Sequence, residues 1–471
     1  MHVKKNDIAR AFTSRVDQIL KNHSGIGVKA LKLVICDHYN VSTCHLNNWL
    51  QNAVMPGIEE VFLKLPTKFR AEYNFPCSVL TNGRGNSIRY FRLTDCAFRP
   101  TVGFNCLRSL TKLNLYQVRI TGDEIWYLIS SSFALEHLGL SLCNELICLK
   151  IPSWLERLRF LRVFHCKMLQ VIESAAPNLS TFELFGDPIQ LTLDESSQLK
   201  NISMGFSYEP NIIGYALDKL PSTMPHLETL TLSSSCEIAV LCHIILVIHS
   251  SLICIFTQRV NTPIVADKFL HLKYLKISLA ICDEAILPRY DYLLLALFLD
   301  ASPALETFVL SVNLADMLHD TAFGETSYTR RIPEHKHNRL KKVQIDGFCS
   351  AKSMAELACH ILENATSLES LTLDTIYNLK GDGNITRCSG QNTGECRLLD
   401  RNLIMEAHKA LGVIKRYILQ RVPCTVKLNV GEPCSRCHAI DVKLPLPYFW
   451  LSPELLNELF AQTLFGSLGR S

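Results

Sequence analysis

The chain has 471 residues, 48% of them hydrophobic and 20% charged, with a formal net charge of +4 and a pI of about 8.2. A charge so close to balance gives no argument for a nucleic-acid or anionic-membrane partner, and we expect neither. The first residues contain no apolar segment typical of a secretory signal, so we expect a cytoplasmic or nuclear chain with reduced thiols.

Residues 1–27 predict a single amphipathic helix. Ile8, Phe12, Val16 and either Ile19 or Leu20 recur at helical spacing and would share one face. A solenoid needs its first repeat covered, so we expect this helix to be an N-terminal cap.

From residue 28 onward one pattern recurs, Leu-x-x-Leu-x-Leu with other apolar residues allowed, as in LTKLNL, LEHLGL, LETLTL and LESLTL. It predicts an α/β leucine-rich-repeat solenoid over residues 28–380, a horseshoe with a parallel β-sheet on its concave face and helices on its convex face. The thirteen repeats start at Val28, Ile58, Ile88, Leu110, Leu135, Leu158, Leu179, Leu199, Leu227, Leu272, Leu305, Leu340 and Leu368.

The segments between the predicted strands favour helices. Residues 122–134 place Ile125, Leu128 and Ile129 on one face, and Ser353 with Glu356 predicts a capping box that starts a second helix.

Four cysteines lie eight residues after a repeat start, where a small buried side chain fits the turn that leaves the strand. We therefore expect buried, reduced thiols at Cys36, Cys96, Cys143 and Cys166.

Strand alternation sends the third, fifth and seventh positions of each repeat to the concave face. In four central repeats these positions are rich in aromatic residues around Arg162, a composition enriched at interface hot spots, so we expect a protein target to bind there. Alternatively, some of the rings fold over the sheet edge or meet the C-terminal cap. The predicted binding residues are Lys112, Asn114, Tyr116, His137, Phe160, Arg162, Phe164, Glu183 and Phe185.

Residues 238–258 form an uncharged apolar segment inside the interval from Leu227 to Leu272. That interval is 45 residues long, and without these 21 residues it would be 24, an ordinary repeat length. We interpret the segment as an insertion, either a translated intron or a natural buried helix. A membrane span is disfavoured because His243 and His249 lie within it.

Residues 381–471 depart from the repeat. A helical stripe from Leu403 to Ile418 is followed by a strand pattern at residues 423–430. We expect a C-terminal cap over the last repeat, with a second partner site as the alternative.

Few residues suggest chemistry, and we expect neither an enzyme nor a cofactor or metal. Cys434, Cys437 and His438 match half of a zinc site, so a metal or redox protein is the rival hypothesis. His335 and His337, at i and i+2, could chelate a metal only from a strand, and we expect a solvated loop there instead. The glycine-rich residues 81–86 favour a simple turn.

The repeats with cysteine at the turn position, the N-terminal run KNHSGIGVKALKL and the run LKKVQIDGFCSAKSMAELACHILENATSLESLTLD resemble plant F-box/leucine-rich-repeat proteins with an FBD-like C-terminal region, which here begins near residue 340. The resemblance implies a substrate receptor of a cullin-RING (SCF-type) ubiquitin ligase, in which the F-box docks on an adaptor and the repeats hold the target. Residues 1–27 are too short for that F-box. We therefore expect adaptor binding only if an F-box is restored, and a truncated product without ligase association is the alternative.

Overall fold

Every predicted repeat start is followed, two residues later, by the first residue of a β-strand. The structure is a computed structural model that describes residues 2–23, 28–36, 39, 41–193, 198–206, 212–234, 268–280, 290–313, 335–377, 399, 401–435, 437 and 438. The chain divides into two compact units, Met1–Ile212 with Ser222–Leu230, and Ile213–Pro221 with Thr231–Ser471. Strand β14 (Thr229–Ser234) and helix α5 (Ile212–Thr223) are divided between the units.

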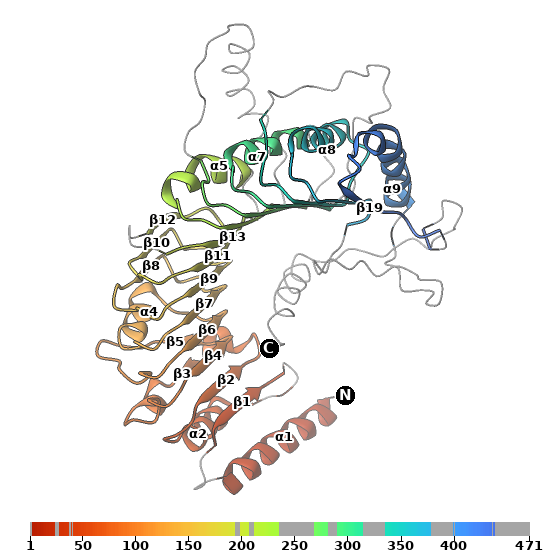
Figure 1. The fold of residues 1–471 in the computed structure, drawn as a ribbon. Helices are drawn as coiled ribbons and strands as arrows, with labels where there is room; N and C mark the ends of the chain where they lie inside the picture. The colour runs from red at the N-terminus through yellow and green to blue at the C-terminus, as the bar shows by residue number, and fades with distance from the viewer. Residues whose placement is uncertain are drawn as a thin grey trace. The chain divides into compact units, whose positions relative to one another are not determined.

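The first unit contains eight parallel strands that pair in chain order (Figure 1). Side chains at the fourth and sixth repeat positions, such as Leu113 and Leu115, are buried in the core behind the sheet. The solenoid prediction is therefore confirmed. The strands are β1 (Ala30–Val34), β2 (Glu60–Lys64), β4 (Tyr90–Thr94), β6 (Lys112–Tyr116), β7 (His137–Ser141), β9 (Phe160–Phe164), β11 (Thr181–Gly186) and β13 (Asn201–Phe206).

The chain returns between these strands in two ways, so the expectation of helices throughout was only partly right. Helix α4 (Gly122–Ile129) buries Ile125, Leu128 and Ile129 as predicted, although it ends before residue 134. The next three repeats return instead through short strands, which form a second parallel sheet on the side of the main sheet where α4 lies (Figure 1). They are β8 (Cys148–Ile151), β10 (Val171–Ser174) and β12 (Gln190–Leu193).

The length of the repeat explains whether the chain returns through a helix or through a short strand. The repeat that holds α4 is 25 residues long, whereas the three that return through strands have 23, 21 and 20. A helix of eight residues spans about 12 Å. Four residues of strand span about 13 Å, so a short repeat covers the same path with fewer residues.

The N-terminal helix α1 (His2–His23) lies against α2 (Thr43–Ala53). The ring of Phe12 stacks on Tyr39 with centroids 4.4 Å apart, and Trp49 Nε1 donates to Asp17 Oδ1 at 2.5 Å. Leu20, rather than Ile19, completes the buried face. The remaining short elements of this unit are α3 (Phe69–Glu72), β3 (Asn74–Phe75), β5 (Ala97–Phe98) and a 3-10 turn at Cys77–Leu80.

The second unit contains five parallel strands in chain order, with α7 (Ala296–Ala301) and α8 (Lys352–Asn364) on one side of them (Figure 1). Helix α9 (Arg401–Val413) continues into a π-helical turn (Ile414–Ile418) and a 3-10 turn (Leu419–Arg421). The strands are β15 (Tyr274–Ala280), β16 (Thr307–Asn313), β17 (Lys342–Asp346), β18 (Ser370–Asp374) and β19 (Lys427–Gly431).

Residues beyond 380 extend this unit. Strand β19 pairs in register with β18, so the sheet continues past the predicted end of the repeats. Ile404 and Ala407 of α9 pack with Ile376 and Leu399 in one apolar cluster. The proposed insertion at residues 238–258 lies outside the described residues.

The capping box predicted at Ser353 and Glu356 was wrong. Helix α8 begins at Lys352 without a side-chain cap, and the Ser353 hydroxyl donates to Tyr290 O and accepts from Tyr292 N in the interior. Burial of the serine diverts its hydroxyl from the helix terminus to another segment. A capping box does start α4, where Thr121 and Glu124 exchange hydrogen bonds.

Three of the four turn cysteines are buried as predicted, and Cys36 is exposed. Each of two buried thiols reaches a carbonyl of the preceding repeat: Cys143 Sγ lies 3.7 Å from Leu115 O, and Cys166 Sγ 3.8 Å from Leu140 O. Cys36 follows β1, the first strand of the sheet, where no preceding repeat strand offers such a carbonyl.

Candidate functional site: the strand face of the first unit

The nine predicted binding residues lie on four adjacent strands, β6, β7, β9 and β11, which are paired in register. Side chains alternate along each strand, so these residues emerge on the face opposite the core. Residues at the same repeat position are aligned across the strands. We call this surface the strand face. In cross-strand order, its predicted positions are Lys112, His137, Phe160 and Thr181; Asn114, Gly139, Arg162 and Glu183; and Tyr116, Ser141, Phe164 and Phe185.

The row at the third position places the cation of Lys112 among rings. Lys112 Nζ lies 5.9 Å from the centre of the Tyr90 ring, and His137 stacks on Phe160 with centroids 4.2 Å apart and planes 4° apart. Burial, together with the charges of Lys112 and Arg162, lowers the pKa of His137 to about 4. At neutral pH this imidazole is therefore an uncharged ring within an aromatic row.

The fifth-position row is built around a glycine. A Cβ at Gly139 would collide with the Asn114 carboxamide, which lies over the glycine. On its other side, Arg162 Nε lies 3.4 Å from Glu183 Oε2. The Arg162 side chain is only 11% exposed, and burial raises the pKa of Glu183 despite that arginine.

At the seventh position the expectation of an exposed aromatic side chain was wrong for Phe164, which is 6% exposed. Phe185 covers it with ring centroids 5.8 Å apart, His165 meets it edge-on at 4.3 Å, and the Arg162 guanidinium lies 5.5 Å from the ring centre. Large neighbours on adjacent strands cover one another, so alternation assigns a side chain to a face without fixing its exposure.

The second and third repeats extend this surface. The Arg92 guanidinium lies 5.0 Å from the centre of the Phe62 ring, and Tyr90 precedes Lys112 in its row. Sequence reasoning stopped at the central repeats and missed Phe62, Tyr90 and Arg92, although the same repeat register identifies them.

The strand face carries an excess of positive charge. Its third, fifth and seventh positions from β1 to β13 include five cations and two carboxylates, and Lys32–Glu60 and Arg162–Glu183 form ion pairs across strands. The cations are Lys32, Lys64, Arg92, Lys112 and Arg162, and the carboxylates are Glu60 and Glu183.

The rival site at Cys434, Cys437 and His438 is a local turn. His438 is buried, its Nδ1 accepts the Cys434 backbone N–H at 3.3 Å, and Cys434 Sγ accepts the Cys437 N–H at 3.5 Å. Within the described ranges, these three side chains do not place their ligand atoms around a common point, whereas Asp300, His337 and His360 do.

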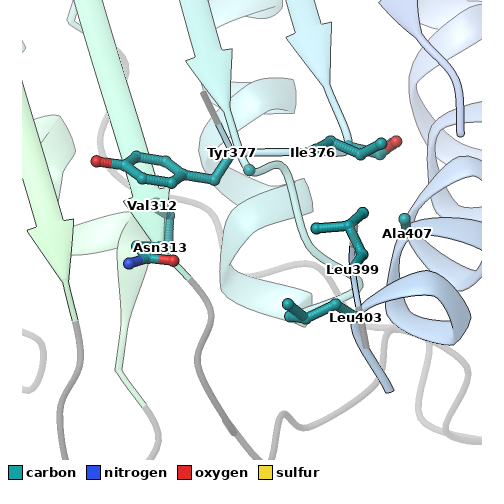
Figure 2. Close-up of a pocket in the computed structure, with 9 residues that line it drawn as sticks. Val312, Asn313, Ile376, Tyr377, Leu399, Leu403 and Ala407 are labelled. Carbon is teal, nitrogen blue, oxygen red and sulfur yellow. The ribbon is translucent and has the colours of Figure 1, made fainter. Parts of the chain in front are cut away.

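A small hollow lies where α9 meets the ends of β16, β17 and β18 (Figure 2). Its volume of about 30 Å³ is enough for one or two water molecules. It is lined mainly by apolar side chains, among them Val312, Ile376, Leu399 and Leu403. The hollow is far smaller than a typical ligand pocket.

Strand order, register and the buried apolar repeat define the class as an α/β leucine-rich-repeat protein. The chain belongs to the family described as At1g61320/AtMIF1, LRR domain, a plant family whose match covers residues 19–245 and 238–435. No curated protein matches the chain. Among solved structures, an internalin (inlF) from Listeria monocytogenes aligns over 94% of this chain and 95% of that chain, with 11% identity and a TM-score of 0.33.

In the part of the chain that the structure describes, no helix combines the length and apolar character needed to cross a bilayer.

Proposed function

We propose that this chain is a non-catalytic protein-binding module whose target lies on the strand face of the first unit. The observation that carries the proposal is the in-register surface of rings and cations, in which His137 stacks on Phe160 and Arg92 lies over Phe62. Aromatic residues and arginine contribute large contact areas at interfaces. Here these side chains already contact one another, so less conformational entropy is lost when a target binds.

The target expected for this surface presents acidic and apolar side chains together. Lys64, Arg92 and Lys112 give the face its positive charge beyond the two cross-strand ion pairs. Attraction between separated charges is screened by salt, so target affinity should fall as ionic strength rises.

The best variants for testing the face are Tyr116→Ala and Phe160→Ala, because both side chains are partly exposed. Arg162→Ala is a poorer test of binding, because it would remove the cation beside the buried Glu183 carboxylate. A buried carboxylate without its cation destabilises the fold. Phe133 is 59% exposed outside the strands, and Phe133→Ala is therefore a matched control.

The test is quantitative capture of proteins from plant extract by the wild-type chain and by these variants, after equal melting temperatures establish that all are folded. Partners held by the wild type and by Phe133→Ala should bind Tyr116→Ala and Phe160→Ala about 30-fold more weakly, a loss of about 2 kcal/mol. Undiminished capture by both face variants would overturn the proposal.

The finer role that we propose is target recognition for a cullin-RING ubiquitin ligase of the cytosol or nucleus. Its support is the resemblance of the run at residues 340–374, which folds as β17, α8 and β18, to F-box proteins with an FBD-like region. Mass spectrometry of the protein recovered from plant cells, expressed from its own gene, should detect adaptor and cullin subunits. Absence of these subunits would reject the ligase role. It would not affect the proposal that the strand face binds a protein, which the capture experiment tests separately.

Adaptor binding is a separate question for the chain of residues 1–471. We expect no specific binding to purified adaptor unless an F-box is fused to the chain. Micromolar binding without the fusion would show that the docking element lies elsewhere in these residues.

A further inference from the structure

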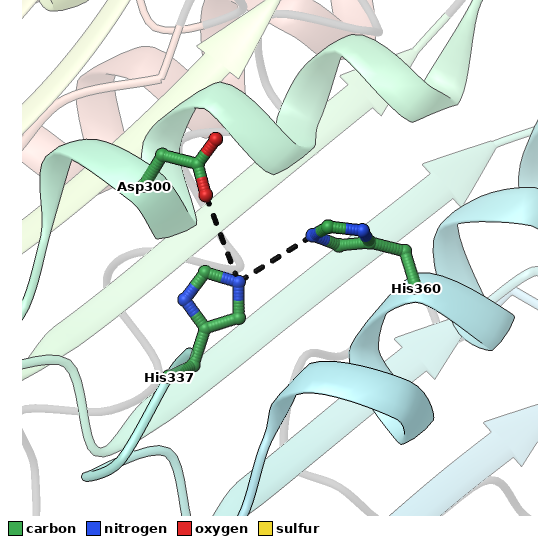
Figure 3. Close-up of side chains that lie close together, drawn as sticks. All are labelled: Asp300, His337 and His360. Carbon is green, nitrogen blue, oxygen red and sulfur yellow. Dashed lines mark hydrogen bonds and ion pairs between the residues drawn. The ribbon is translucent and has the colours of Figure 1, made fainter. Parts of the chain in front are cut away.

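Two histidines and an aspartate meet in the second unit (Figure 3). Asp300 comes from α7, His337 from the segment that leads into β17, and His360 from α8. His337 Nε2 lies 3.5 Å from His360 Nε2 and 3.8 Å from Asp300 Oδ1, and all three ligand atoms lie within 4.8 Å of one another.

The expectation of a solvated loop at this position was wrong for His337. Its side chain is buried like that of His360, and its backbone N–H donates to Asn364 O at 2.9 Å, which holds the segment against the end of α8. His335, two residues earlier, is exposed. The segment therefore aims one imidazole inward and presents the other at the surface.

Two of the three separations between the ligand atoms are close to the value that a small cation requires. A tetrahedral ion with ligands about 2.0–2.1 Å away holds those ligands about 3.4 Å from one another. Distances of 3.5 and 3.8 Å between the facing atoms need only small side-chain shifts to reach that arrangement. Imidazole and carboxylate are ligands typical of Zn²⁺.

Without a cation, His337 Nε2 and His360 Nε2 lie within hydrogen-bond distance, so one imidazole can donate to the other. Burial, with the neighbouring histidines His360 and His335, lowers the pKa of His337 to about 4, and burial also lowers the pKa of His360. An imidazole binds a metal ion in its neutral form. Asp300 Oδ1 is buried and has no hydrogen-bond partner.

We propose that Asp300, His337 and His360 bind one Zn²⁺ ion. The ion would fasten α7, the segment before β17 and α8 to one another, which is a structural role that goes beyond target binding.

Asn364 provides the second layer of this site. Its amide lies 3.2 Å from His360 Nδ1. The same amide Nδ2 donates to His360 O at 2.9 Å, so Asn364 contacts both the ring and the backbone of His360.

The test uses the full chain, stripped of metal by a chelator and kept reduced by a phosphine that does not bind zinc. Titration with Zn²⁺ should give one bound ion per chain and a higher melting temperature. X-ray absorption should show only nitrogen and oxygen ligands near 2.0–2.1 Å, because thiolate ligands lie at about 2.3 Å. A thiolate signal, or no bound ion, would overturn the proposal.

Variants separate this site from the chain's cysteines. Asp300→Asn and His360→Asn should weaken zinc affinity at least about tenfold and lose the zinc-dependent rise in melting temperature, as loss of a ligand predicts. Replacing the exposed His271 with Asn is the matched histidine control. Cys434→Ser with Cys437→Ser should keep full binding.

The opposite pattern, with binding kept by His360→Asn and lost with the two cysteines, would assign the metal to the rival site. Melting temperatures of all variants without zinc show whether each is folded. If His360→Asn does not fold, zinc binding by Asp300→Asn is the test, because this variant removes the carboxylate charge and keeps the size and shape of the side chain.

Discussion

At the scale of single residues, the face that a side chain occupies could be predicted, but its exposure could not. Repeat alternation placed Phe160 and Phe164 on the same face, yet contacts with Phe185 and His165 bury only the second ring. Cys36 shares its repeat position with Cys143 but has no preceding strand to bury it. Such differences depend on the neighbouring repeat, which the pattern within one repeat does not specify.

His137 makes a residue-scale prediction about pH. Its folded pKa of about 4 lies below its ordinary value of 6.5, so the unfolded chain binds more protons between these values. Stability from the neutral ring is complete above pH 6.5 and is lost as the pH falls toward 4.

The substitution that tests this is His137→Phe, which keeps the stack on Phe160 and removes the titrating group. Unfolding free energies measured by urea denaturation from pH 4 to 8 should fall less steeply toward acid in the variant than in the wild type. Equal slopes would show that His137 protonates in the folded state as it does in the unfolded one.

At the scale of elements, the strands could be predicted from sequence and the return segments only partly. The apolar period fixed where every repeat strand begins, whereas short repeats returned through β8, β10 and β12 instead of helices. Ser353 and Glu356 matched a capping pattern but are buried, because α8 packs against the segment that contains Tyr290 and Tyr292. A local sequence pattern fails to predict a helix cap where packing against a segment distant in sequence determines the contacts of the side chain.

The capping box of α4 carries the element-scale prediction. Thr121→Ala removes the hydroxyl that accepts from Glu124 N, so it should lower the free energy of unfolding by about 1 kcal/mol. Thr121→Ser keeps the hydroxyl and is the control. Thermal melts that show the same loss for both variants would mean that the threonine methyl group, not the cap, stabilises this region.

At the scale of the whole molecule, the solenoid could be predicted, but the meeting of Asp300, His337 and His360 could not. Each of these residues lies in a segment between strands, where the repeat pattern imposes no register. A motif search finds ligands close in sequence, such as Cys434 and Cys437. The three-residue cluster instead depends on how α7 and α8 pack beside the segment before β17.

The apolar residues 238–258 give a prediction for the whole chain. The two matches to the family, residues 19–245 and 238–435, meet within this segment, and its removal leaves a repeat of 24 residues. We expect a chain without these residues to fold and to melt no lower than the full chain, because two ordinary repeats would then be adjacent. A lower melting temperature, or failure to fold, would show that the segment is part of the core.

The central claim, that the strand face binds a protein, is tested most directly by site-specific photocrosslinking in plant cells. A benzophenone amino acid replaces Tyr116 on the strand face in one protein and the exposed Phe133 outside the strands in another. The account predicts a discrete crosslinked protein from position 116 that is lost when Phe160 is changed to Ala, and none from position 133. The same product from position 133, or no product from position 116, would contradict it.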